Sequence, residues 1–491
     1  MATRRLTLGA LVVTISALLL SQWQTQVSRI SPVVGRNNTA LFVVTSDHGL
    51  SNVHLATAQG LLERHPHVRL HFASFAPLKP RLHRISSHSQ NPNKHDVQFH
   101  LIDGLSVIDT CITHGKNTSN LIHPRGLAGI AHLCKDMQLL VSPWAGDEHL
   151  SIYSQVKSII DEVDPAVVVD TALRPALDAT RDKNRLYAFI TPNTLIDNFP
   201  AEQPWAKMLW KYPAYGSGIP YPVPWSNIPE NILLNVRFIW SMLSMPGMKE
   251  KRNFFKAHGL TDPISFLRLH RPDVPWLTQT TPGASLPVDF VPPNVTCTGP
   301  MTLSLGSAAE QDEELAAWLA RAPTILINLG GDLRVQVLWK FRKEGLYSDS
   351  FMDSLAPFTK NGRLRVEHWL AVEPLSLMET GNVIVSVHHG GSGCYHEAIS
   401  AGIPHVILPL WLDLYGFAQL GESIGVAVWG CRETNPYWTP NCLYRDIVRE
   451  IQSSEGLTLQ EKSRELGLRL QQNPGRYIAA QEIAKLAGAG I

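Results

Sequence analysis

The sequence predicts an α/β protein built from two consecutive doubly wound domains that face each other across a cleft, and three observations lead to this expectation. Short apolar runs alternate with amphipathic helical patterns in both halves of the 491-residue chain, which is typical of βαβ units. The alternation stops at an extended proline-rich segment, residues 287–300, and restarts beyond it. At about 150 residues per domain, the length accommodates two large domains.

The first 30 residues carry a separate signal. Arg4 and Arg5 precede an uncharged stretch from Leu6 to Leu20, the pattern of a signal sequence, and the small residues that a cleavage site needs are poorly placed. We expect an uncleaved anchor over 1–30 that crosses the endoplasmic reticulum membrane once; a cleaved signal peptide and a buried first helix are the alternatives. The whole chain has 43 Lys and Arg against 42 Asp and Glu, so we expect no nucleic-acid partner.

The first domain, residues 31–286, begins with strand, helix and strand patterns and continues with a second set. The expected strands and helices are Leu41–Thr45, Asn52–Arg64, Val68–Phe75, Ala166–Val169, Pro175–Arg181 and Leu186–Thr191. From Pro200 to Pro282 the composition changes: tryptophans and tyrosines are interleaved with many prolines, and helical periodicity is present only around Ile232–Leu243. We expect this stretch to be an insertion outside the sheet.

The linker, residues 287–300, precedes a second domain at 301–491. Its expected elements are Thr324–Leu329, Ser348–Ala356, Leu364–His368, Val383–Val387, Ser392–Ala401, His405–Leu408 and Asp413–Glu422. Six cysteines lie far apart without a C-x-x-C pair, so the spacing predicts neither a zinc site nor a disulfide framework.

A glycine-rich turn in the second domain is the most informative motif. The strand at Val383–Val387 runs into His388-His389-Gly390-Gly391-Ser392-Gly393 and then into a helix. Glycines let main-chain amides approach a phosphate, and the helix dipole favours negative charge at that end. The turn does not match a dinucleotide-binding fingerprint, a Walker loop, a zinc-protease helix or a nucleophile elbow, because it lacks a residue that each of these motifs requires.

Together with its neighbours, this turn resembles the donor site of the family 1 UDP-glycosyltransferases. That signature places a Trp before His-x-Gly-x-x-x-x-x-Glu and then a Pro and an Asp-Gln pair; the corresponding residues here are Trp369, His389, Gly391, Glu397, Pro409 and Asp413. Asn328-Leu329-Gly330 and the segment from Pro292 to Pro300 extend the likeness over nearly the whole chain after the anchor. The motif sequences look most like those of fungal members of the family. The resemblance implies the GT-B fold, with C-terminal helices between Leu457 and Ala487 packing back on the first domain.

The resemblance also implies roles for the donor residues. Trp369 would stack on uracil, Glu397 would accept the ribose hydroxyls, and Asp413 would bind sugar hydroxyls. The diphosphate would lie against His389 and the main chain of Gly391, Ser392, Gly393 and Cys394, near Gly330. Three positions depart from the family: Gly393-Cys394 replaces Asn-Ser, Leu414 replaces Gln, and Ala371-Val372 replaces Pro-Gln.

Inverting transfer requires a base that takes the acceptor's proton and a group that orients this base. The family's catalytic His follows the first strand, where a gapless match places Leu50, and the histidines nearby are His48 and His54. We favour His48 because a loop residue can face the cleft. Asp170, at the end of a strand, is the expected orienting acid, with Asp47 as the alternative. No D-x-D pair occurs, so we expect no metal and no cofactor besides the UDP-sugar.

The expected reaction is transfer of a hexose, glucose by preference, from a UDP-sugar to a hydroxyl of a lipophilic small molecule such as a fungal secondary metabolite. The aromatic insertion would form the acceptor pocket, because a broad apolar ligand needs aromatic walls. The alternatives are a nucleotide-sugar epimerase or hydrolase, and a UDP-sugar-binding protein without transfer activity.

Overall fold

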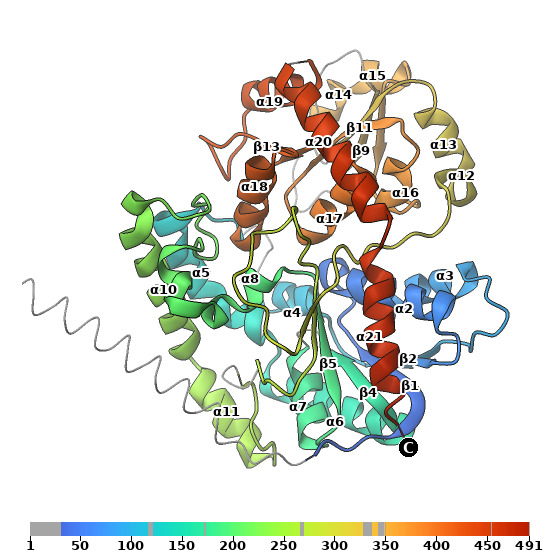
Figure 1. Ribbon diagram of the computed structural model, residues 1–491, viewed down its shortest axis with the longest axis vertical. Helices are drawn as coiled ribbons and strands as arrows, with labels where there is room; N and C mark the ends of the chain where they lie inside the picture. Colours follow the sequence, from blue (N-terminus) through green and yellow to red (C-terminus); the bar gives the residue numbers. More distant parts are fainter. Residues whose placement is uncertain are drawn as a thin grey trace, which may run out of the picture.

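The computed structural model describes residues 31–115, 121–170, 173–265, 270–327, 336–341, 348, 350–452 and 454–490. Figure 1 shows two α/β units, one above the other, each with helices around a central sheet. The expected N-terminal anchor at 1–30 lies outside the described residues, and within them no helix is long and apolar enough to span a bilayer.

The first domain is organised around a parallel seven-stranded sheet with the order β3-β2-β1-β4-β5-β6-β7. Its strands are β1 (Arg36–Val43), β2 (Arg69–Ser74), β3 (Gln98–Leu101), β4 (Pro165–Asp170), β5 (Tyr187–Thr191), β6 (Trp276–Thr278) and β7 (Val295–Cys297). The strands form because runs such as Leu41–Val43 are buried on both faces, as a sheet covered by helices requires.

Helices cover both faces of this sheet. They are α2 (His48–Arg64), α3 (Lys79–His88), α4 (Val107–Thr113), α5 (Gly126–Val141), α6 (Gly146–Val163), α7 (Arg174–Asp182), α8 (Leu195–Asn198), α9 (Lys207–Trp210), α10 (Ile228–Leu243) and α11 (Met248–Ala257). Short 3-10 turns are η1 (Ala76–Leu78), η3 (Pro200–Glu202), η4 (Pro204–Ala206) and η5 (Trp225–Asn227).

Two expectations for the boundary region differ from the structure. The insertion ends in β6, which pairs with β5, and the linker contains β7, which pairs with β6 as an edge strand. Both strands are only three residues long. Strands this short, set among prolines, have too few residues for an alternating pattern to be recognised in the sequence.

The second domain repeats the doubly wound arrangement with a parallel six-stranded sheet in the order β10-β9-β8-β11-β12-β13. The strands are β8 (Thr324–Ile327), β9 (Gln336–Lys340), β10 (Leu364–Glu367), β11 (Val383–His388), β12 (His405–Ile407) and β13 (Ala427–Trp429). The helices are α12 (Ala308–Gln311), α13 (Glu313–Leu319), α14 (Ser350–Asp353), α15 (Ala356–Lys360), α16 (Pro374–Met378), α17 (Ser392–Ala401), α18 (Leu412–Ile424), α19 (Pro440–Gln452), α20 (Ser454–Gln471) and α21 (Gly475–Ala487).

The last helix returns to the first domain. In Figure 1 the chain descends from α20, against the upper unit, to α21 beside β1 and α2 of the lower unit. Ala480 and Ile483 of α21 are fully buried in the same apolar cluster as Phe42 and Leu61. Packing of the C-terminal helix on the first domain, which the family resemblance implied, is therefore present.

One cysteine expectation was wrong. Cys431 and Cys442 form a disulfide, with Cα atoms 5.4 Å apart and a sequence separation of 11 residues. The loop between β13 and α19 brings the two residues together. The spacing alone could not identify the pair, because this spacing matches no recognised disulfide or metal-binding pattern.

Candidate active site

The glycine-rich turn lies where strand order reverses in the second sheet. It follows β11, which sits between β8 and β12, so the turn opens at the carboxyl edge of the sheet where doubly wound proteins bind ligands. Gly391 is the N-cap of α17 and no side chain caps the helix. The first amides of α17 therefore lack main-chain acceptors, as at any helix start, and can bind an anion.

The two histidines before the glycines shape this turn. The amide of Gly390 donates to Nδ1 of His388 at 3.0 Å, and the amide of Gly391 donates to Nδ1 of His389 at 2.8 Å. Burial lowers the pKa of His389 to about 4, and nearby Lys340 lowers it further. His389 is therefore neutral with its proton on Nε2, which makes that atom a hydrogen-bond donor. The amide of Gly391, expected to face the diphosphate, instead fixes this tautomer.

The donor residues expected from the sequence line one cavity of about 460 Å³. Gly330 is the exception, because it lies outside the described residues. The cavity lies between the domains, and its walls include Trp369, His389, Gly391, Ser392, Gly393, Cys394, Glu397 and Asp413 from the second domain and His48, Arg81 and Asn193 from the first.

Trp369 lines this cavity, and a cation lies over its ring. Nζ of Lys340 is 3.4 Å from the centroid of the indole ring, a close cation-π contact. The ring of His48 lies 4.6 Å from the same indole, centroid to centroid. Sequence analysis missed Lys340 because a lysine at the end of a strand carries no motif. A ring stacked on this face of Trp369 would have to displace the ammonium group.

Glu397 is a buried carboxyl group whose surroundings disfavour its ionised form. Burial raises its pKa to about 8, the negative charge of Glu373 adds to the rise, and Lys340 and Arg81 oppose it. The carboxyl is thus mostly protonated at neutral pH when the cavity is empty. Hydroxyl groups donated by a ligand would favour the ionised form, because a hydrogen-bonded carboxylate is stabilised.

Two arginines of α3 bring further positive charge to the cavity, and sequence analysis missed both. Arg81 donates to Oγ of Ser51 at 2.8 Å, and Arg84 forms an ion pair at 3.1 Å with Glu373 of the other domain. Both arginines line the cavity. They sit on a helix that no motif distinguished, so only the fold reveals that they line the same cavity as the turn.

Ser392 and Cys394 differ in part from the expected phosphate contacts. The hydroxyl of Ser392 donates to the carbonyl of Pro192 in the first domain, which leaves its main-chain amide for a ligand. Burial raises the pKa of the Cys394 thiol to about 12, with Glu397 adding to the rise. The thiol is therefore neutral at physiological pH and carries no negative charge that would repel a diphosphate.

A first-domain residue, His123, holds the start of helix α18, which carries Asp413. His123 donates its amide to Leu410 O at 3.1 Å, and its Nε2 accepts from the amide of Leu412 at 3.2 Å. Its carbonyl accepts from Tyr415 Oη at 2.6 Å. Leu412 has a left-handed φ of 40°, a conformation that costs free energy without such support. These three bonds fix the start of α18 across the interdomain cleft.

Asp413 is the point at which two cavities meet. It lines the donor cavity and also a second cavity of about 540 Å³. Burial raises the pKa of Asp413 to about 7, Asp197 adds to the rise, and a 3.4 Å hydrogen bond from Asn193 Nδ2 to Asp413 Oδ2 opposes it. The second cavity is lined mostly by the insertion, including Tyr215 and Phe238.

The three catalytic candidates occupy different environments. His48 begins α2 and faces the donor cavity. His54 is fully buried, donates from Nδ1 to Leu50 O at 3.1 Å, and has a pKa lowered by burial to about 4. Asp170 ends β4, is fully buried and lines neither of the two cavities. Asp47, the alternative acid, is engaged by Ser106 and Val107 through 3.1 and 3.2 Å bonds.

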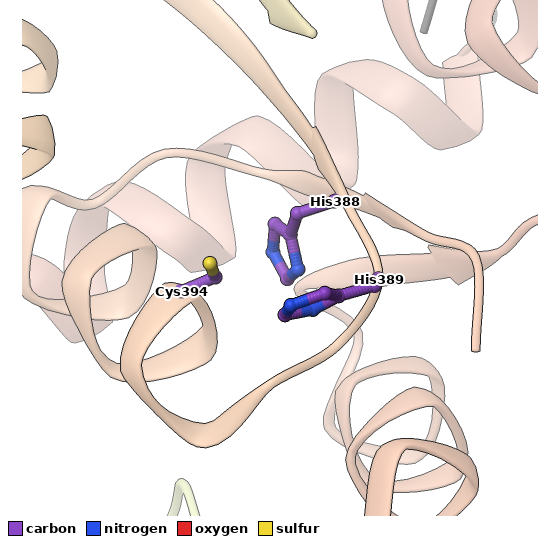
Figure 2. Close-up of side chains that lie close together, drawn as sticks. All are labelled: His388, His389 and Cys394. Atoms are coloured by element: carbon purple, nitrogen blue, oxygen red, sulfur yellow. The ribbon is translucent and has the colours of Figure 1, made fainter. Parts of the chain in front are cut away.

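One group of side chains near the turn could gather around a metal ion. Figure 2 shows His388 and His389 side by side at the end of β11, with Cys394 opposite on α17, and one ligand atom from each lies within 4.8 Å of the others. Both ring nitrogens of His388 already form hydrogen bonds, with Gly390 N and with Nδ1 of His405. Metal binding here would have to break one of them.

Comparison with solved structures gives the class of protein. A UDP-glucosyltransferase from Polygonum tinctorium, 14% identical, aligns over 93% of this chain and 99% of its own with a TM-score of 0.57. TcCGT1 in complex with UDP, also 14% identical, aligns over 91% and 98% with the same score. The fold is that of the GT-B glycosyltransferases.

Curated sequences give the family. Glycosyltransferase sdnJ of Sordaria araneosa is 31% identical over 433 residues, which is 80% of this chain and 84% of the relative. A sterol 3-beta-glucosyltransferase of Leptosphaeria maculans is 36% identical over 98 residues, 20% of this chain and 6% of its own. No family model matches the chain. The chain belongs to the UDP-glycosyltransferase family and is a glycosyltransferase.

Proposed function

We propose that this enzyme transfers a hexose, glucose by preference, from a UDP-sugar to a hydroxyl group of a lipophilic small molecule, with inversion at the sugar carbon. The observation that carries the proposal is the junction of two cavities at Asp413. One cavity has the cations and the helix start that suit a diphosphate, and the other has aromatic and aliphatic walls. We propose a fungal secondary metabolite as the acceptor; the relative from Sordaria araneosa is a glycosyltransferase.

The donor is proposed to lie with uracil on Trp369 and the ribose hydroxyls on Glu397. The diphosphate lies at the start of α17, where the amides of Ser392 and Gly393 and Nε2 of His389 donate to it. Charge that builds on the leaving UDP is stabilised there, together with Lys340 and the arginines of α3. No metal or further cofactor enters this proposal.

The acceptor's hydroxyl oxygen attacks the anomeric carbon as the bond from that carbon to the phosphate oxygen breaks. A base takes the hydroxyl proton, and we assign this role to His48, with Asp413 on the sugar hydroxyls. Asp413 competes for the role of base, because it lines both cavities and has a pKa near 7, which suits proton transfer at neutral pH. Asp170 remains the proposed orienting acid, although it lines neither cavity.

The anchor remains part of the proposal. The uncharged stretch from Leu6 to Leu20 would hold the enzyme on the endoplasmic reticulum membrane by a single pass, close to lipophilic acceptors.

The test follows UDP release from UDP-glucose with and without a panel of lipophilic alcohols. Release that depends on the acceptor, together with a glycosylated product of inverted configuration, supports the proposal. Turnover without acceptor would instead indicate a hydrolase or epimerase, and binding without turnover a non-catalytic protein. The variants His48→Ala and Asp413→Asn distinguish the two candidate bases. Replacing the true base should lower kcat by a factor on the order of 10² and remove the limb of the pH profile that this base produces.

A further inference from the structure

Helix α10 (Ile228–Leu243) presents two apolar faces where a helix of a water-soluble enzyme has one. Its inner face buries Asn231 and Leu234 against the first domain. Its outer face is apolar and exposed over an arc of about 120°, from the spacing of 100° per residue. The exposed side chains on this arc are Ile232, Leu233, Val236, Ile239, Trp240 and Leu243.

The exposure of this outer face is large for side chains of this size. Trp240 is 69% exposed, Leu243 57% and Leu233 52%. The polar positions Glu230, Arg237 and Ser241 fall together on a separate narrow sector of the same helix. In Figure 1 α10 lies at the outer margin of the molecule, beside α5. A contiguous exposed apolar face of this kind marks an interaction surface.

Tryptophans and cations flank the helix. Trp225 in η5 is 87% exposed and Trp205 in η4 is 84% exposed; η5 leads directly into α10, and η4 contacts α9, which packs on α10. Between residues 228 and 257 there are five lysines and arginines against two glutamates, among them the exposed Lys249 and Lys256 of α11. Exposed tryptophan with aliphatic side chains and neighbouring cations is the composition of a helix that lies in the interface of an anionic bilayer.

The same helix forms a wall of the apolar cavity. Asn235, Phe238, Ile239 and Met242 line that cavity, and Ile239 is also 40% exposed on the outer face. The outer apolar surface therefore continues into the cavity around Ile239. A molecule dissolved in the bilayer leaflet that contacts α10 would reach the cavity without passing through water.

We propose that α10, with Trp225 and Trp205, is a docking surface for the headgroup region of an anionic phospholipid bilayer and delivers the acceptor from the lipid phase. The bilayer contact stands on the exposed surface alone; the delivery role rests on the proposed function. The contact is separate from the expected anchor at 1–30 and would orient the cavity mouth toward the lipid.

The experiment uses the full chain, without UDP-sugar or acceptor, and measures hydrogen–deuterium exchange with phosphatidylcholine vesicles that contain or lack phosphatidylserine. Exchange is read locally, over peptides that span residues 225–243, so that binding through another part of the chain is distinguished. The test variant carries Trp225→Ser, Trp240→Ser and Leu243→Ser. The matched control carries Tyr437→Ser and Leu468→Ser, two exposed apolar side chains of the second domain.

We expect exchange over 225–243 to slow on vesicles, more so with phosphatidylserine, and the control variant to behave like the wild type. The test variant is expected to lose this local protection. Its affinity for vesicles through this surface should fall roughly tenfold. Unchanged exchange at α10 on vesicles to which the chain is bound would overturn the proposal, as would protection that grows with protein concentration without vesicles, since the occupant would then be a second copy. Wild-type exchange decides the question even if the test variant does not fold. Absence of transferase activity would leave the bilayer contact untouched.

Discussion

Binding of the UDP-sugar should release a proton from Glu397. The carboxyl is protonated in the empty cavity because burial raises its pKa to about 8. In the proposed complex two ribose hydroxyls donate to it, which requires its ionised form. The perturbation that isolates this residue is Glu397→Gln, which keeps the shape of the side chain and removes the titration.

The magnitude follows from the pKa. At pH 6.5 about 3% of a carboxyl with a pKa near 8 is ionised, and at pH 8.5 about three quarters, so binding should tighten roughly twentyfold across this range. The Gln variant should bind about ten- to a hundredfold more weakly at pH 8.5, because it loses a charge-assisted hydrogen bond, and Glu397 should contribute no pH dependence.

The assay is calorimetric titration with UDP-glucose in buffers of different ionisation enthalpy, which counts the protons released. Asp413 also titrates near neutrality, so the informative quantity is the difference between wild type and variant. This difference should be close to one proton at pH 6.5 and a small fraction at pH 8.5. The control is Glu313→Gln, an exposed carboxyl on α13 outside the cavity. Equal proton release by wild type and Glu397→Gln would refute the assignment.

Four further predictions follow. His48→Ala should lose on the order of 10² in kcat with an unchanged melting temperature, whereas His54→Ala, which empties a fully buried position, should cost about 2 kcal/mol of unfolding free energy by denaturant titration. Gly391→Ala should weaken UDP binding more than Gly393→Ala, because an added Cβ meets Cε1 of His389 at 2.4 Å at the first position and nothing within 4 Å at the second; equal binding would contradict the role of the turn. His123→Ala should raise the Kd for UDP-glucose more than that for UDP, because it frees the start of α18, which carries Asp413, the proposed ligand of the sugar hydroxyls, and a parallel loss for both ligands would argue against this. The unfolding free energy should fall as pH drops from 6.5 to 4, by up to about 3 kcal/mol for each buried histidine such as His54, because these histidines bind protons in the unfolded chain but stay neutral in the folded one. A flat profile in this window would show these residues to be solvated.

The doubly wound plan could be predicted from the sequence because both sheets are parallel and buried on both faces. Strands such as β1 and β11 then read as continuous apolar runs followed by helix starts. The short edge strands β6 and β7 could not be predicted, because three residues beside prolines carry no periodic signal. The disulfide between Cys431 and Cys442 depends on a loop that brings them together, which spacing does not encode.

The donor cavity was partly predictable for a similar reason. The glycines and the residues at fixed spacing, Trp369 to Asp413, belong to one local stretch of chain, and the structure gathers them in one cavity. Lys340, Arg81 and His123 come from distant elements without motifs, so only the tertiary fold brings them to the site. The choice between His48 and His54 depended on which side of α2 faces the cleft, and the structure places only His48 on the cavity wall.

An experimental structure of the chain with UDP bound would test the proposed donor site. We predict the diphosphate oxygens within about 3 Å of the first amides of α17, uracil on the face of Trp369 with Lys340 displaced, and the ribose hydroxyls on Glu397. UDP bound elsewhere, or an indole still covered by the Lys340 ammonium group in a fully occupied complex, would contradict it.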